Sequence, residues 1–154
     1  MTNVTTHIGK LVQEHLPNAD ELTHRLVTAT VGLLVGVAYS DRDYSDVEEA
    51  MVRKRLSQLD SFSRLEVNAV CKVLRAGIDA LRQDDPSTWP KVVNELTDRW
   101  QRLELLELLV DVAGADEVLT KEESAFLERT AEALELGADD LKKSLDRLSV
   151  TKET

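Results

Sequence analysis

The sequence is poor in the residues that mark several familiar protein classes. A single cysteine, Cys71, among 154 residues rules out an intrachain disulfide and fits a reducing compartment. Aromatic residues make up 4% of the chain, so the core must consist mainly of leucine, valine and alanine. Six glycines and three prolines are few for the many turns of an all-β fold. These shortages favour a protein built from long helices.

Positive charge and long apolar runs are scarce as well. Nineteen basic residues face 29 acidic ones, which gives a net charge of −10. Nucleic-acid binding is not expected, because phosphate contacts need a basic face, whereas cations or a basic partner surface suit an acidic protein. The longest mostly apolar stretch, residues 26–39, is shorter than the about 20 residues that span a bilayer. No signal peptide is evident at the start, so we expect a cytoplasmic protein without direct membrane insertion.

A short pattern occurs twice in the chain, 75 positions apart (116 − 41). Residues 33–48 read LLVGVAYSDRDYSDVE, and residues 108–123 read LLVDVAGADEVLTKEE. Each copy is an apolar helix that runs into an Asp and a short turn. A new helix then opens with Ser or Thr and carries Glu three residues later. Internal repeats fix the architecture, so this one predicts two similar helix–turn–helix halves.

Apolar spacing and capping residues predict helices along the whole chain, and no convincing strand-like alternation appears. We expect one all-α domain of seven or eight helices over residues 1–154, with a core of about 18–148 and a frayed tail after it. Gly32 and Gly36 share one face of the second helix and permit close approach by another helix. The expected helices are 4–15, 18 or 20 to 39, 45–59, 61 or 63 to 81, one capped by Thr88, 100–113, one from Thr120 that Gly137 ends, and 139–148.

The two acidic turns are the main functional candidate. Asp41 and Asp116 each follow the C-terminal end of an apolar helix, where a negative charge is disfavoured by about 0.3–1 kcal/mol. Either backbone N–H groups of the turn or a bound cation could compensate that charge, and the sequence leaves both open. Glu48 and Glu123 complete Ser/Thr-x-x-Glu capping boxes, a structural role that needs no ligand.

Oxygen ligands in a turn suit hard cations such as Ca²⁺ or Mg²⁺. The start of the first turn is similar to that of an EF-hand loop, but an EF-hand is rejected because its sixth position is Asp46 instead of Gly and its twelfth is Val52. No Gly-rich phosphate loop, zinc pair or nucleophile elbow is present, so we expect a non-enzymatic protein. The candidate metal ligands are Asp41, Asp43, Glu48, Asp116 and Glu123.

In these residues the chain resembles the TerB family, whose usual form is an Ala-x-x-Asp-Gly turn followed by Ser/Thr-x-x-Glu in each half. The matching segments are Ala38 to Asp41 with Ser45 to Glu48, and Ala113 to Asp116 with Thr120 to Glu123, and the resemblance covers roughly residues 26–148. It implies a compact seven-helix domain that binds metal ions through acidic side chains, at positions 41, 48, 116 and 123. It also implies a role in bacterial tellurite resistance and stress responses.

The resemblance further implies contacts with membrane-bound partners, since related domains occur in membrane-anchored DnaJ-like co-chaperones. The chain departs from the family in one respect: Arg42 and Glu117 stand where a Gly normally follows each Asp. Losing Gly removes easy access to positive φ, and Arg42 can pair with the local carboxylates in place of a cation.

We therefore expect a TerB-like domain that binds a divalent cation and a protein partner, and through that partner lies at the periphery of the inner membrane. The alternatives are a metal-free helical interaction module and an enzyme whose site is assembled across helices.

Overall fold

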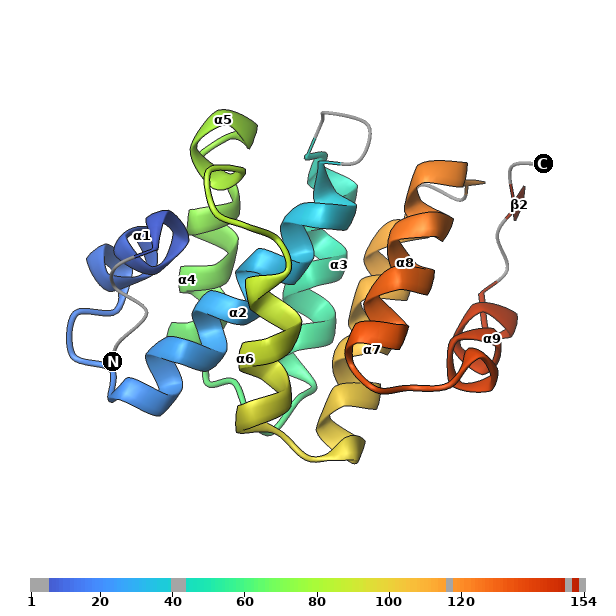
Figure 1. Cartoon of the computed structure of the whole chain (residues 1–154). Helices are drawn as coiled ribbons and strands as arrows, with labels where there is room; N and C mark the ends of the chain where they lie inside the picture. Colours follow the sequence, from blue (N-terminus) through green and yellow to red (C-terminus); the bar gives the residue numbers. More distant parts are fainter. Residues whose placement is uncertain (1–5, 40–43, 116–117, 149–150, 153–154) are drawn as a thin grey trace.

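The computed structural model describes residues 6–39, 44–115, 118–148 and 151–152, and most of them lie in helices (Figure 1). The prediction of an all-α fold is confirmed. Within these ranges the elements are α1 (His7–His15), α2 (Glu21–Ala38), α3 (Asp46–Ser57), α4 (Arg64–Leu74), α5 (Ile78–Leu81), α6 (Thr88–Leu96), α7 (Arg99–Ala113), β1 (Val118–Leu119), α8 (Lys121–Ala133), α9 (Ala138–Asp146) and β2 (Thr151–Lys152).

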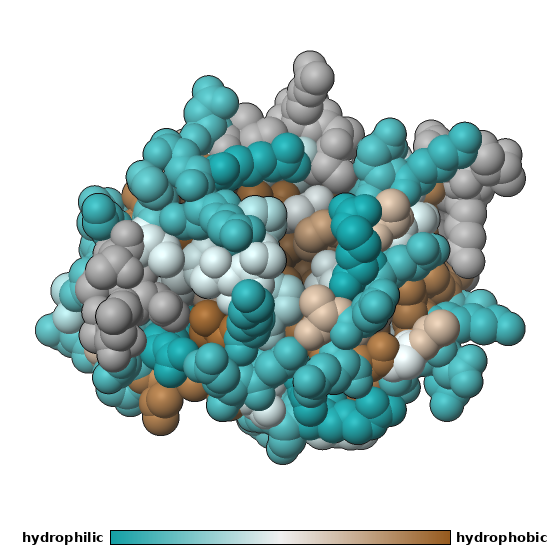
Figure 2. Space-filling view, in the orientation of Figure 1, coloured by the Kyte–Doolittle hydropathy of each residue, from teal (hydrophilic) through white to brown (hydrophobic). Residues whose placement is uncertain are grey.

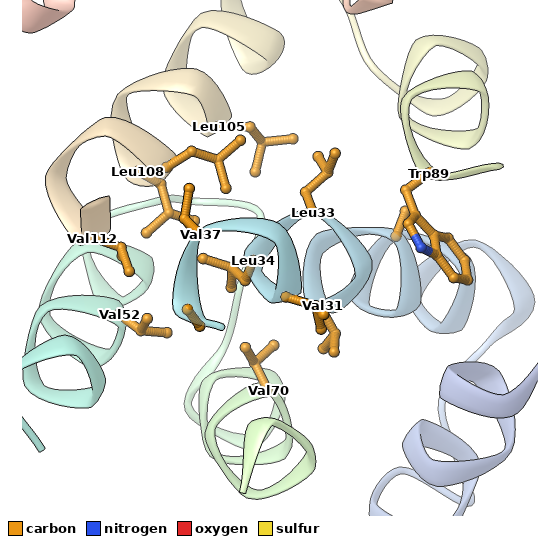
Figure 3. Packing of buried hydrophobic residues seen from close by; sticks show 14 of the residues in the cluster. Val31, Leu33, Leu34, Val37, Val52, Val70, Trp89, Leu105, Leu108 and Val112 are labelled. Atoms are coloured by element: carbon orange, nitrogen blue, oxygen red, sulfur yellow. The ribbon is translucent and has the colours of Figure 1, made fainter. Parts of the chain in front are cut away.

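Helix α2 lies at the centre of the fold. From Val27 to Val35 every residue is buried, and α1, α4, α6, α7 and α8 all pack on it. A helix that is apolar all round needs such a shell, because it has no face suited to water. Figure 3 shows its side chains meeting Val52 of α3, Val70 of α4, Trp89 of α6 and Leu105 of α7. One continuous apolar cluster therefore surrounds this helix.

The sequence repeat has a counterpart in the packing. Helix α4 packs on α2 and α3, as α9 packs on α7 and α8. Helix α3 packs against α7, as α8 packs against α2, while α2 and α7 contact each other. The second helix of each half thus lies on the first helix of the other half. Leu34 and Leu109, which are 75 positions apart, are both fully buried at this centre.

One predicted helix proved to be two. The segment expected to be helical as far as residue 81 ends at Leu74, and the short α5 follows after a turn. Gly77 has a φ of +99° in that turn, a left-handed conformation that glycine adopts without a Cβ penalty. The break gives nine helices in the described residues, against the predicted seven or eight.

The predicted end of α8 at Gly137 was also wrong. The helix ends at Ala133, and Glu135 takes the left-handed conformation, with a φ of 62°. Gly137 is instead the N-cap of α9, and its N–H donates to Asp140 Oδ2 over 2.9 Å. Thr88 proved to be the first residue of α6 rather than its cap, which is Ser87.

Two short strands fall outside the all-helical expectation. Val118 pairs with Thr151 and Leu119 with Lys152 in a parallel register. The segment 151–152, predicted to be frayed, is thus paired with the residues that precede α8. A pairing of two residues is too short to appear as alternation in the sequence.

The close approach predicted at the glycines of α2 is confirmed. A Cβ at Gly32 would overlap the indole ring of Trp89 from α6, and one at Gly36 would overlap the ring of Phe126 from α8. Two aromatic rings therefore lie directly on the backbone of α2.

We predict that Gly32→Ala destabilises the protein by about 1–3 kcal/mol, because overpacking outweighs the about 1 kcal/mol that alanine gains in helix propensity. The added methyl group would meet the root of the Trp89 ring, which is 2% exposed and cannot move aside. Gly36→Ala should cost less, since it meets the outer edge of the Phe126 ring. Urea unfolding of both variants measures the order, and a stabilising Gly32→Ala would contradict the packing.

Candidate functional site at the repeated acidic turns

The first turn ends in a well-formed helix start. The Ser45 hydroxyl accepts the Glu48 N–H over 3.1 Å, and Glu48 Oε1 accepts the Ser45 N–H over 2.9 Å. This reciprocal pair is a capping box, as the sequence predicts. It holds the Glu48 side chain inward, so that the residue is only 4% exposed.

The second turn repeats this geometry. The Thr120 hydroxyl accepts the Glu123 N–H over 3.1 Å, and Glu123 Oε1 accepts the Thr120 N–H over 2.9 Å. Glu123 is also 4% exposed. The second predicted capping box is therefore confirmed, and each half of the repeat buries one glutamate at the start of a helix.

The predicted metal ligands fall into two groups. Asp41, Asp43 and Asp116 lie outside the described residues, whereas Glu48 and Glu123 are in place. Helices α3 and α8, which carry these glutamates, both begin at the upper edge of the molecule in Figure 1. Within the described residues no group of three or more His, Cys, Asp or Glu side chains is placed to hold a metal ion.

A basic residue that the sequence did not reveal lies beside the first turn. Arg75 Nε is 2.7 Å from Glu49 Oε1, and its Nη2 is 2.7 Å from Asp46 Oδ1. The guanidinium also lies 5.0 Å from the centre of the Tyr44 ring, a cation–π contact. Arg75 thus forms ion pairs with two carboxylates in the first helical turn of α3, and its single charge offsets one of them. Arg42, which we expected to play this part, lies outside the described residues.

Tyr44 stands between this arginine and the core. Its ring centre is 5.9 Å from that of Tyr39, and its buried hydroxyl has no hydrogen-bond partner among the described residues. Burial raises the pKa of the Tyr44 hydroxyl further above its ordinary value of about 10, at which the phenol is already neutral near pH 7. It contributes no charged oxygen to the turn.

A buried acidic residue that sequence reasoning missed lies on α7. Asp111 is 5% exposed and accepts from two arginines: its Oδ2 is 2.7 Å from Arg55 Nε, and its Oδ1 is 3.0 Å from Arg147 Nη1. Glu107 Oε2 lies 3.6 Å from Arg55 Nη2. The cluster connects α3, α7 and the C-cap of α9, and its two guanidinium groups compensate the Asp111 charge.

The family model described as Tellurite resistance protein TerB matches residues 27–145. The chain belongs to the TerB family. The matched range begins within α2 and ends within α9, so this TerB domain includes both halves of the repeat. No curated protein and no solved structure shows a significant match to the chain. In the part of the TerB domain that the structure describes, no helix is long and apolar enough to cross a membrane.

We predict that Ser45→Ala and Thr120→Ala each lower the free energy of unfolding by about 1 kcal/mol, because each removes the oxygen that accepts an otherwise unpaired helix N–H. Denaturant unfolding measures both effects. Ser61→Ala is the matched control, since Ser61 is exposed and caps no helix. An unchanged midpoint for both cap variants would mean that these hydroxyls do not hold the helix starts.

Proposed function

We propose that this TerB domain is a non-enzymatic protein that binds Ca²⁺ or Mg²⁺ at its two acidic turns. Asp41, Asp43 and Glu48 would supply oxygen ligands at the first turn, and Asp116 and Glu123 at the second. The observation that supports this proposal is the pair of buried glutamates, each 4% exposed at the same place in the repeat. Each glutamate follows one of the aspartates closely in sequence.

The physical reason is the cost of gathering carboxylates. Burial disfavours the charged form of a glutamate, and nearby like charges disfavour it further. The backbone N–H groups and the positive end of a helix offset part of that cost at Glu48 and Glu123. An aspartate added close to each glutamate increases the local negative charge. A hard cation held by these oxygens would remove the repulsion.

The family description suggests a role in tellurite resistance, and we extend the proposal to that response. In this role the domain would dock a protein partner at the periphery of the inner membrane. The net charge of −10 favours a partner with a basic surface. Cation binding at the turns would change the charge of the edge at which α3 and α8 begin, and so adjust that docking.

One observation favours a second candidate, a metal-free helical interaction module. The acidic residues at the start of α3 already have partners, since Asp46 and Glu49 pair with Arg75 and Glu48 accepts the Ser45 N–H. In this alternative the acidic turns serve only as caps and as a charged docking surface.

Thermal unfolding in millimolar Ca²⁺ or Mg²⁺ tests the proposal, because a cation that binds only the folded state raises the melting temperature by mass action. We predict a rise for the wild-type protein relative to potassium chloride of equal ionic strength. Asp41→Asn, which removes charge at nearly constant shape, should abolish most of that rise. Arg42→Gly, which restores the family's turn, should increase it.

Asp60→Asn is the matched control, because it removes one exposed negative charge from the turn between α3 and α4. It should leave the cation-dependent rise intact. A wild-type melting curve that neither cation moves would reject the metal site and leave the interaction module. An equal loss in Asp41→Asn and Asp60→Asn would mean that the cations act only by general screening.

A further inference from the structure

A hollow of about 480 Å³ lies between α3 and α4. Its lining consists of two arginines, two neutral polar residues and two apolar residues: Arg53, Arg64, Ser57, Asn68, Phe62 and Val67. Phe62 and Val67 are buried, so the hollow presents mainly polar side chains. No carboxylate is among these described residues. In a chain with a net charge of −10, this hollow is therefore lined by positive charge alone.

The polar residues of the hollow face one another across the hairpin of α3 and α4. Arg53 and Ser57 are four positions apart on α3, and Arg64 and Asn68 are four apart on α4, so each pair lies on one side of its helix. Arg53 Nη1 donates to Asn68 Oδ1 over 2.6 Å, which holds this guanidinium at the hollow. The Asn68 amide uses its oxygen in this contact, and its N–H groups make no hydrogen bond with the described residues.

Neither arginine has a carboxylate partner among the described residues. The Arg53 guanidinium bonds only to the neutral Asn68 side chain. Arg64 is exposed and makes no side-chain hydrogen bond or ion pair within the described part of the chain. Two guanidinium charges thus lie at one hollow without a direct counter-charge.

The acidic residues nearby in sequence are engaged elsewhere, and none of them lines the hollow. Glu66 Oε1 accepts a backbone N–H at the start of α4 over 3.0 Å, so it offsets the positive end of that helix. Asp60 lies toward α7, where burial and the Asp60 charge raise the pKa of Glu104. Glu49 pairs with Arg75. The positive charge of the hollow therefore has no carboxylate of its own.

The second half of the repeat provides an internal comparison. Glu128 and Glu132 are equivalent to Arg53 and Ser57 at the offset of 75 (128 − 53 and 132 − 57), and they line a corresponding hollow between α8 and α9. Figure 2 shows apolar side chains between these two helices, with hydrophilic side chains around them. One lysine, Lys142, completes the charged lining of that hollow. The positive, polar lining thus belongs to the first half and does not follow from the hairpin geometry.

We propose that the hollow between α3 and α4 binds a doubly charged oxyanion, the phosphate group of a small phosphomonoester. The guanidinium groups of Arg53 and Arg64 bind its oxygens from the two helices, and the Asn68 amide donates a further hydrogen bond. Guanidinium forks match phosphate oxygens in geometry, and two of them balance a charge of about −2. The hollow lies at the opposite end of α3 from Glu48, so this inference does not depend on the proposed cation site.

Inorganic phosphate and glycerol 3-phosphate are the probes, with nitrate at equal ionic strength as a singly charged oxyanion. NMR of the full chain follows the Nε–H signals of Arg53 and Arg64 and the side-chain amide of Asn68. We predict saturable changes in these signals with both phosphates, with a dissociation constant on the order of 1 mM. Nitrate should bind about tenfold more weakly, because it carries half the charge.

Charge variants complete the test. Arg53→Gln and Arg64→Gln should each weaken phosphate binding by about threefold to tenfold. Arg129→Gln is the matched control, because Arg129 is an exposed arginine of α8 that does not line this hollow. Equal responses to phosphate and nitrate would mean general screening and overturn the proposal. Equal effects of Arg64→Gln and Arg129→Gln, or phosphate-dependent signals that spare Asn68, would do so as well.

Discussion

The fold depends on the burial of α2. This helix presents apolar side chains in every direction, so it is stable only inside a shell of other helices. Its neighbours differ in kind around its circumference. Leucines and valines of α3, α4 and α7 pack against it (Figure 3). Helices α6 and α8 place the rings of Trp89 and Phe126 on its glycine face. The positions of α1, α4, α6, α7 and α8 follow from how each one covers this helix, and α9 packs on α7 and α8 in turn.

The two halves of the repeat use equivalent positions for different purposes. Gly32 and Gly36 correspond to Glu107 and Asp111, at the same offset of 75 (107 − 32 and 111 − 36). On α2 these positions are bare backbone under aromatic rings. On α7 they carry carboxylates that two arginines compensate. One face is therefore covered by aromatic rings and the other by an ion-pair network. The two halves of the repeat differ in the size and charge of the side chains at these equivalent positions.

Local features could be predicted from the sequence, and distant partners could not. The capping boxes at Ser45 and Thr120 depend on side chains three residues apart, so their spacing identified them. The glycine face of α2 was visible for the same reason. In contrast, Arg75 reaches Asp46 from 29 positions away, and Arg147 reaches Asp111 from 36. No periodicity marks such pairs. The helix break at Gly77 was missed because the apolar spacing continues across it. The left-handed conformation at Glu135 was missed because that position is not a glycine, the residue that usually adopts it.

Helix α8 connects the second acidic turn to the core. Its start is held by the capping box of Thr120 and Glu123, and one turn further on the ring of Phe126 lies against the backbone of α2 at Gly36. In the first half the equivalent helix α3 is joined to α7 by the ion pair of Arg55 with Asp111. The buried glutamates at the starts of α3 and α8 therefore occupy equivalent places in the repeat, although an ion pair holds one helix and aromatic packing holds the other.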